Sequence, residues 1–123
     1  MFEERKGKMQ YGYMGSYVRV DLTEGNITFQ TFSDEELRKY IGGTGLGTKI
    51  LYDETDITTD PLGPENVLTF NTGPLVGTKA PNFGRYHVVT KSPLTGKYAE
   101  ANSGGKFGPA LRKSGYDGII VTG

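Results

Sequence analysis

The chain has 123 residues, and its 14 lysines and arginines balance 14 aspartates and glutamates, so the formal net charge is zero. A neutral chain of this length is one domain or part of one, and it lacks the basic surface of a general nucleic-acid binder. It contains no cysteine, which excludes a disulfide, a thiolate-bound zinc ion and an iron–sulfur cluster held by its own thiolates. No apolar run approaches the roughly 20 residues of a membrane helix, and the charged N-terminus is no secretory signal. We therefore expect a cytoplasmic protein without a membrane or nucleic-acid partner.

The order of apolar and turn-forming residues predicts an α+β fold that is dominated by a β-sheet and carries two or three short helices. Apolar side chains that alternate with polar ones, or that form short runs between turns, indicate the strands. The strands are expected at 17–22, 27–32, 67–70, 86–90 and 118–122. A capping box of Ser33 and Glu36 marks the start of the first helix. The helices are expected at 33–41, 45–52 and 106–114.

The two ends of the chain carry separate expectations. Residues 1–11 are charged and are expected to form a frayed leader in front of a domain over 12–123. The apolar strand at 118–122 is of the kind that lies inside a sheet, yet little chain follows it that could pair with it. We therefore expect an incomplete domain with unpaired strand edges, through which a homo-oligomer could form.

The glycine-rich segment 42–47 has the composition of a phosphate-binding loop without its spacing. Position 48 is a threonine where the dinucleotide fingerprint needs glycine, and the segment follows a helix rather than a strand. A corner between two helices is the better interpretation. The amides that begin the second helix could still receive an anion.

Glycines and prolines concentrate between residues 73 and 108, a composition typical of backbone that approaches a bulky anionic ligand closely. Arg85 begins a strand there, and its planar guanidinium is suited to bind a phosphate or a fused heterocycle. A solvated surface arginine is the alternative. Asn102 follows a strand, and Gly104 and Gly105 after it could turn their amides outward as an anion-binding nest. An ordinary turn explains these residues equally well.

The only histidine and a cluster of three carboxylates are the candidate metal ligands in the chain, and each would need further ligands nearby. His87 is the only histidine, and without a second histidine or a cysteine we expect it to pack or to hydrogen-bond rather than to bind a metal. Asp53, Glu54 and Asp56 cluster after a helix end. We interpret them as solvated loop charges rather than metal ligands, because no complementary carboxylates recur nearby.

Seven segments of the chain follow one another in a familiar order and spacing. They are GSYVRVDL (15–22), YIGGTGLG (40–47), DPLGPEN (60–66), TGPLVGT (72–78), GRYHVVTKSPLTG (84–96), ANSGGKFG (101–108) and GYDGIIVTG (115–123). Together they resemble the N-terminal region of the tungsten-containing aldehyde ferredoxin oxidoreductases. The resemblance runs from about Gly12 to the last residue.

The resemblance implies that the chain is an incomplete half of a pterin-binding N-terminal domain, a β-rich base for a bis-pterin tungsten or molybdenum cofactor. It implies pterin contacts for Arg85 and for the backbone of Gly104. It also implies that the backbone carbonyl of Asn102 helps to hold a magnesium ion between the two pterin phosphates. Thr44 stands where the family often has an arginine, so no contact is carried over to that position.

In this family the four-iron cluster and most of the substrate pocket belong to later domains, and the reaction oxidises an aldehyde to a carboxylic acid and passes electrons to ferredoxin. By resemblance, the chain alone should therefore be inactive and bind no cofactor, and its partner would be the remainder of the enzyme. An alternative is a free-standing small subunit or binding module that docks on a separate catalytic chain. A third interpretation is a diverged structural protein without catalysis.

Overall fold

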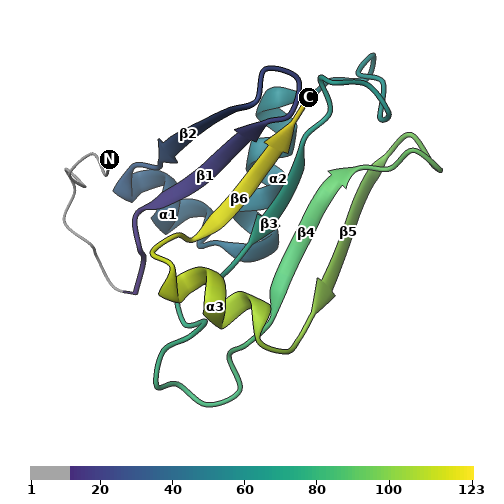
Figure 1. The fold of residues 1–123 in the computed structure, drawn as a ribbon. Helices are drawn as coiled ribbons and strands as arrows, with labels where there is room; N and C mark the ends of the chain where they lie inside the picture. Colours follow the sequence, from purple (N-terminus) through teal and green to yellow (C-terminus); the bar gives the residue numbers. More distant parts are fainter. Residues whose placement is uncertain (1–11) are drawn as a thin grey trace.

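A computed structural model describes residues 12–123, so the leader predicted at 1–11 lies outside the described residues. The described part forms one six-stranded sheet with three short helices (Figure 1). The strands are β1 (Ser16–Asp21), β2 (Asn26–Thr31), β3 (Leu68–Asn71), β4 (Tyr86–Lys91), β5 (Tyr98–Ser103) and β6 (Gly118–Thr122). The helices are α1 (Asp34–Tyr40), α2 (Gly43–Glu54) and α3 (Phe107–Lys113). The predicted sheet-dominated α+β class is confirmed.

The strands lie in the order β2-β1-β6-β3-β4-β5. β1 and β6 are parallel, and every other neighbouring pair is antiparallel. Ile119 of β6 has Val18 opposite it on one side and Phe70 on the other. β6 therefore lies inside the sheet, as expected for such an apolar strand, and both of its partners, β1 and β3, precede it in the chain. The edges of the sheet are β2 and β5.

Helices α1 and α2 cover one face of the sheet, the rear face in Figure 1. α2 packs against β3 and β4, and α1 packs against α2. The core between these layers consists of Tyr17, Leu46, Ile50, Leu51, Val67, Val89 and Ile120. Because side chains alternate along a strand, the neighbours of these core residues point to the opposite face, where Ile27 and Phe29 of β2 are exposed. None of the helices between residues 12 and 123 has the length and hydropathy that a bilayer crossing requires.

The corner between α1 and α2 explains the glycine-rich segment. The predicted capping box is present, since Ser33 Oγ accepts from the amide of Glu36 at 3.1 Å and the carboxylate of Glu36 accepts from the amide of Ser33 at 2.9 Å. α2 begins at Gly43, two residues earlier than predicted. A Cβ at Gly45 would lie 2.3 Å from the carbonyl oxygen of Tyr40, and one at Gly47 would lie 2.5 Å from the side chain of Asn71. These glycines let α2 approach both α1 and the sheet.

The connection from α2 to β3 contains no helix or strand, as predicted for residues 58–66. Lys91 of β4 is buried beneath it. Its ammonium donates to the carbonyl oxygens of Asp56, Ile57 and Thr59 at 3.0, 3.2 and 2.7 Å. A buried charge is tolerated where hydrogen bonds replace its water, so this lysine ties the connection to the sheet.

Candidate functional site

The candidate site lies where β4 begins and β5 ends. Arg85 directly precedes β4, and its Nη1 donates to Oδ1 of Asn102 on β5 at 2.7 Å. Beside this pair is an open cavity of about 430 Å³. Its lining residues are Ala80, Asn82, Phe83, Gly84, Arg85, Gly104 and Gly105. The fold therefore brings together Arg85, Asn102 and Gly104, the three site residues that the sequence predicted.

Three of the seven residues that line this cavity are glycines, namely Gly84, Gly104 and Gly105. A Cβ added at Gly104 would meet no atom within 4 Å, so packing within the chain does not require a glycine there. Gly105 has a φ of +90°, in the left-handed region that favours glycine. Backbone without side chains allows a bulky group to approach the amides closely. With the guanidinium of Arg85, the wall is suited to an anionic group such as a phosphate.

Asn102 and Ser103 belong to β5 rather than to the turn that was considered for them. Tyr86 pairs with Ser103, and His87 pairs with Asn102. Pairing with β4 overrides the turn preference of this Asn-Ser-Gly-Gly segment, as tertiary contacts often do for residues with low strand propensity. Asn102 is thereby held on an edge strand, which has one row of backbone carbonyl groups without a partner in the sheet.

A polar cluster continues from the site along the side of β4 and β5 that faces α2. Oγ1 of Thr44 lies 3.0 Å from Nδ1 of His87 and donates to Oε2 of Glu100 at 3.1 Å. The hydrogen-bonding role predicted for His87 is confirmed. The sequence did not point to Thr44 or Glu100 as its partners, because they come from two other elements. Strand alternation gives one signal, since Glu100 and Asn102 lie two residues apart and share a face.

The N-terminus of α2 uses three of its amides, those of Gly43, Gly45 and Leu46, within the corner. The amide of Gly43 donates to the carbonyl of Thr72 at 3.0 Å. The amides of Gly45 and Leu46 donate to the carbonyl of Gly42 at 3.1 and 3.3 Å. The interpretation of residues 42–47 as a corner between helices therefore fits better than that of an anion site.

The three carboxylates near the end of α2 have separate partners within the chain. These carboxylates are those of Asp53, Glu54 and Asp56. Asp53 forms an ion pair with Lys49, and Glu54 accepts two hydrogen bonds of 2.7 Å from Arg19. Asp56 accepts from the hydroxyl and the amide of Thr58 at 2.6 and 2.7 Å. Between residues 12 and 123, no group of three or more histidine, cysteine, aspartate or glutamate side chains could hold a metal ion.

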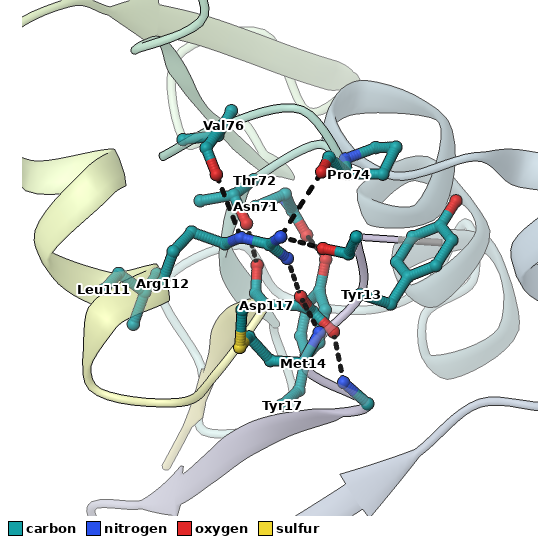
Figure 2. A network of polar contacts seen from close by, with 12 residues as sticks. Tyr13, Met14, Tyr17, Asn71, Thr72, Pro74, Val76, Leu111, Arg112 and Asp117 are labelled. Atoms are coloured by element: carbon teal, nitrogen blue, oxygen red, sulfur yellow. Dashed lines mark hydrogen bonds and ion pairs between the residues drawn. The ribbon is translucent and has the colours of Figure 1, made fainter. Parts of the chain in front are cut away.

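A buried ion pair between Arg112 and Asp117 fixes the loops beside the cavity (Figure 2). Arg112 belongs to α3 and is only 3% exposed. Its Nε donates to the carbonyl of Val76 at 3.1 Å, and its Nη2 donates to the carbonyls of Gly12 and Pro74. The segment that leads into the cavity wall is thus held at two carbonyl groups by one side chain.

Asp117 extends this Arg112–Asp117 clamp to the start of β1. Its carboxylate accepts from the amides of Met14 and Gly15 at 2.9 and 2.8 Å. Its carbonyl accepts from the amide and the hydroxyl of Thr72 at 3.0 and 2.6 Å. The sequence reasoning missed the clamp, because an arginine five residues before an aspartate is an ordinary spacing and the carbonyl partners come from distant segments.

A buried polar chain lies next to the clamp and reaches β4. Tyr17 donates to Oδ1 of Asn71 at 2.9 Å, and burial, with a smaller contribution from the charge of Asp117, raises the pKa of Tyr17 well above its ordinary value. The side-chain amide of Asn71 donates in turn to Thr69 and to the carbonyl of His87, at 2.8 and 3.2 Å. The backbone of His87 is therefore fixed from the core side.

Comparisons with known proteins place this fold and these segments in context. The family model described as aldehyde ferredoxin oxidoreductase, N-terminal domain, matches residues 17–123. The tungsten-containing aldehyde ferredoxin oxidoreductase of Pyrococcus abyssi is 52% identical over 113 residues, which cover 92% of this chain and 19% of the relative. A Pyrococcus furiosus protein named aliphatic sulfonate oxidoreductase, WOR-like subunit, is 39% identical over 116 residues, which cover 92% of this chain and 18% of the relative. The chain thus spans less than a fifth of the length of these curated relatives.

One solved structure has the same fold in a longer chain. It is the active site complex BamBC of benzoyl coenzyme A reductase in complex with 1,5-dienoyl-CoA. The superposition has a TM-score of 0.90 at 39% sequence identity, and it covers 94% of this chain and 18% of that chain. The six-stranded sheet described above therefore recurs as one region of a larger protein.

Proposed function

The chain belongs to the aldehyde ferredoxin oxidoreductase family, whose N-terminal domain matches residues 17–123, and on this premise we propose that it forms part of the platform that binds a tungsten or molybdenum bis-pterin cofactor. Residues 12–123 would be a partial N-terminal domain of such an enzyme. When bound, the cofactor would supply the chemistry that oxidises an aldehyde to a carboxylic acid. This chain would supply position and recognition.

The observation that carries the proposal is that Arg85 and Gly104 line one cavity, and that Asn102 hydrogen-bonds to Arg85 beside it. The site suits the anionic end of a pterin cofactor, because a guanidinium favours phosphate and glycine backbone lets a phosphate approach closely. Asn102 uses its side chain to orient Arg85, which leaves further donors of the guanidinium for a ligand. Gly104 would offer its backbone to the pterin without steric conflict.

A magnesium ion is the second component that we propose for this site. The ion prefers oxygen ligands, and it commonly joins few protein groups to phosphate oxygens. The backbone carbonyl of Asn102, on edge strand β5, would provide one such ligand. The four-iron cluster would be held elsewhere in the enzyme, since this chain has no cysteine.

The partner that we propose is the remainder of the enzyme, because the chain spans less than a fifth of its curated relatives. Alone, the chain would be inactive and would not retain the cofactor. Within the assembled, cytoplasmic enzyme the electrons would pass to ferredoxin. The edge strands β2 and β5 also offer free backbone groups through which a homo-oligomer could form. No nucleic acid and no membrane is proposed as a partner.

Metal and pterin analysis tests this proposal. We would measure tungsten, molybdenum and pterin in the chain alone and in the chain assembled with the rest of its enzyme. We expect all cofactor in the assembled sample, and we expect Arg85→Ala to remove it. Arg38→Ala, which changes an exposed arginine on α1, is the matched control and should retain it. Full cofactor content in the Arg85→Ala enzyme would contradict the assignment of this site.

A second candidate function is a free-standing small subunit that docks on a separate catalytic chain. Its support is the similarity to a protein named as a subunit and to a chain solved within a complex. The apolar sheet face opposite α1 and α2 would serve either form of attachment. Purification of the native protein distinguishes the two, since a subunit would separate from its catalytic chain under denaturing conditions and a domain would not.

A further inference from the structure

The side of the β4–β5 pair that faces α2 has a consistent polarity. At its loop end the guanidinium of Arg85 supplies hydrogen-bond donors, and Gly104 and Gly105 line the same cavity with backbone that has no side chain. Asn102 lies on this side too, because it pairs with His87, whose ring contacts α2. Two residues along β5, or about 7 Å, the carboxylate of Glu100 presents only acceptors.

Thr44 determines which nitrogen of His87 carries the proton. The carboxylate of Glu100 has no proton to give, so the hydroxyl proton of Thr44 is committed to Oε2. The oxygen of Thr44 must then accept its 3.0 Å hydrogen bond from Nδ1–H of His87. In the neutral imidazole this leaves Nε2 without a proton, as a hydrogen-bond acceptor.

The Nε2 edge of the ring is not closed off by a side chain of the corner. It lies beside Gly43, where an added Cβ would be 3.3 Å from Cδ2 and 3.8 Å from Nε2 of the imidazole. The side chain of His87 remains 30% exposed. The glycine thus leaves room next to an acceptor whose orientation is already fixed by Thr44 and Glu100.

We propose that His87 is a further cofactor contact, whose Nε2 accepts a hydrogen bond from an N–H group of the pterin heterocycle. Thr44 and Glu100 are positioning residues that hold the imidazole in this form. The inference rests on the proposed function, and it adds a direction to it: the phosphate binds at the loop end beside Arg85, and the heterocycle extends along β4 and β5 toward α2.

The polarity of this surface selects such a ligand. A pterin cofactor has an anionic phosphate at one end and a heterocycle with amino and ring N–H groups at the other. A ligand that is anionic throughout would meet the negative charge of Glu100. A ligand with only N–H groups would leave Arg85 without a partner. The donor end and the acceptor end together match a molecule that carries both kinds of group.

The tautomer can be measured directly, because the chain contains a single histidine. Long-range proton–nitrogen NMR correlations of the ¹⁵N-labelled chain report which ring nitrogen bears the proton in the neutral form. We expect the Nδ1–H form in the wild type and in Thr44→Ser, and a mixture of forms in Thr44→Val. An Nε2–H imidazole in the wild type would overturn the proposal.

Cofactor retention tests the contact itself. In the assembled enzyme, His87→Phe keeps a ring but has no acceptor, and we expect the tungsten and pterin retained on dilution to fall about five-fold, the factor of one neutral hydrogen bond. His87→Gln supplies an amide acceptor and should recover part of the loss. Tyr98→Phe alters the same face of β5 beyond Glu100 and should retain the full content.

The two proposals fail in different ways. If Arg85→Ala removes the cofactor and His87→Phe retains all of it, the inference about His87 is wrong and the platform stands. If both variants retain the cofactor, the site itself is wrong. If His87→Phe loses the cofactor and His87→Gln recovers none of it, the ring has a packing role rather than an acceptor role, and the inference is again wrong.

Discussion

Arg85 and Arg112 lie close to the same loops and have opposite surroundings. Arg112 is 3% exposed, and Asp117 and three backbone carbonyls occupy its guanidinium. Arg85 is exposed, and one hydrogen bond to Asn102 orients it. Arg112 therefore uses four of its five N–H donors inside the protein, whereas Arg85 uses one and has the others available.

This difference assigns two roles to two neighbouring arginines: Arg112 stabilises the fold, and Arg85 is available to bind a ligand. A buried charge must be matched by the protein because water cannot reach it. An exposed charge contributes little to stability, so a fixed orientation at an exposed position suggests a ligand. The Arg112–Asp117 clamp fixes the loops beside the cavity, and Arg85 is thereby held in position to bind a ligand. The predictions below test this division.

The largest effect is expected for Arg112→Ala. The substitution leaves the carboxylate of Asp117 buried without its cation, and we expect the free energy of unfolding to fall by about 3–5 kcal/mol. Urea unfolding followed by circular dichroism measures it. Arg85→Ala is the matched control and should change stability by no more than about 0.5 kcal/mol. Equal losses for the two variants would remove the distinction between them.

Two glycine substitutions test the same difference, one at a packed position and one at the cavity. A Cβ at Gly118 would lie 2.3 Å from the ring of Tyr17 and 2.6 Å from the carbonyl oxygen of Phe70. We expect Gly118→Ala to cost about 1–3 kcal/mol through overpacking. Gly104→Ala has free space around the new methyl group, so its melting temperature should match the wild type. Cofactor content in the assembled enzyme should fall for Gly104→Ala, and a normal content would argue against a backbone contact there.

The helix cap at Ser33 is an intermediate case, because it is exposed and yet its partners are backbone groups. Ser33→Ala removes the acceptor for the amide of Glu36, and we expect a loss of about 1 kcal/mol. Thermal unfolding would detect it. Ser33→Asp, which retains a capping oxygen, should lose much less. If Ser33→Ala lowered the free energy of unfolding as much as Arg112→Ala, burial would not be what distinguishes side chains with large effects on stability from those with small effects.

The smallest effect concerns acid stability at Asp56. Hydrogen bonds from Thr58 lower the pKa of Asp56 below its ordinary 3.8. The folded state therefore binds a proton at Asp56 less readily than the unfolded state does. The stabilisation that ionised Asp56 gives the folded state is present above pH 3.8, and it is lost as the pH falls through the lowered pKa of the folded state. Thr58→Val should flatten this part of the stability curve, measured by urea unfolding at stepped pH. An unchanged curve would mean that the hydrogen bonds add nothing.

Local patterns were sufficient to predict most elements of the fold. The capping box at Ser33, the alternation in β1 and β2 and the apolar run of β6 each depend on neighbours in sequence, and all are present. The position of β6 between β1 and β3 was not predictable, because strand order depends on pairing between distant segments. The expected strands do not include β5, for the same reason, since it is pairing with β4 that draws Asn102 and Ser103 into the sheet.

The candidate site was predicted in part. Arg85, Asn102 and Gly104 stood out because glycine-rich loops around an arginine have a direct chemical meaning. Nothing local links Thr44 to His87 and Glu100, which come from three different elements. The Arg112–Asp117 clamp gave no signal either, since its two side chains bond to five backbone groups, and a backbone partner leaves no mark in the sequence.

The central position of β6 has a consequence for how the molecule is assembled over time. β1 and β2 form one hairpin, β3, β4 and β5 form another antiparallel unit, and among the strands of residues 12–123 only β6 pairs with a strand of each. During synthesis the two units must therefore wait, each with an open edge, until residues 118–122 have left the ribosome. Contacts between such distant segments slow folding, and open edges attract other chains. The interval before β6 emerges is thus a period in which a nascent chain is exposed to pairing with other chains.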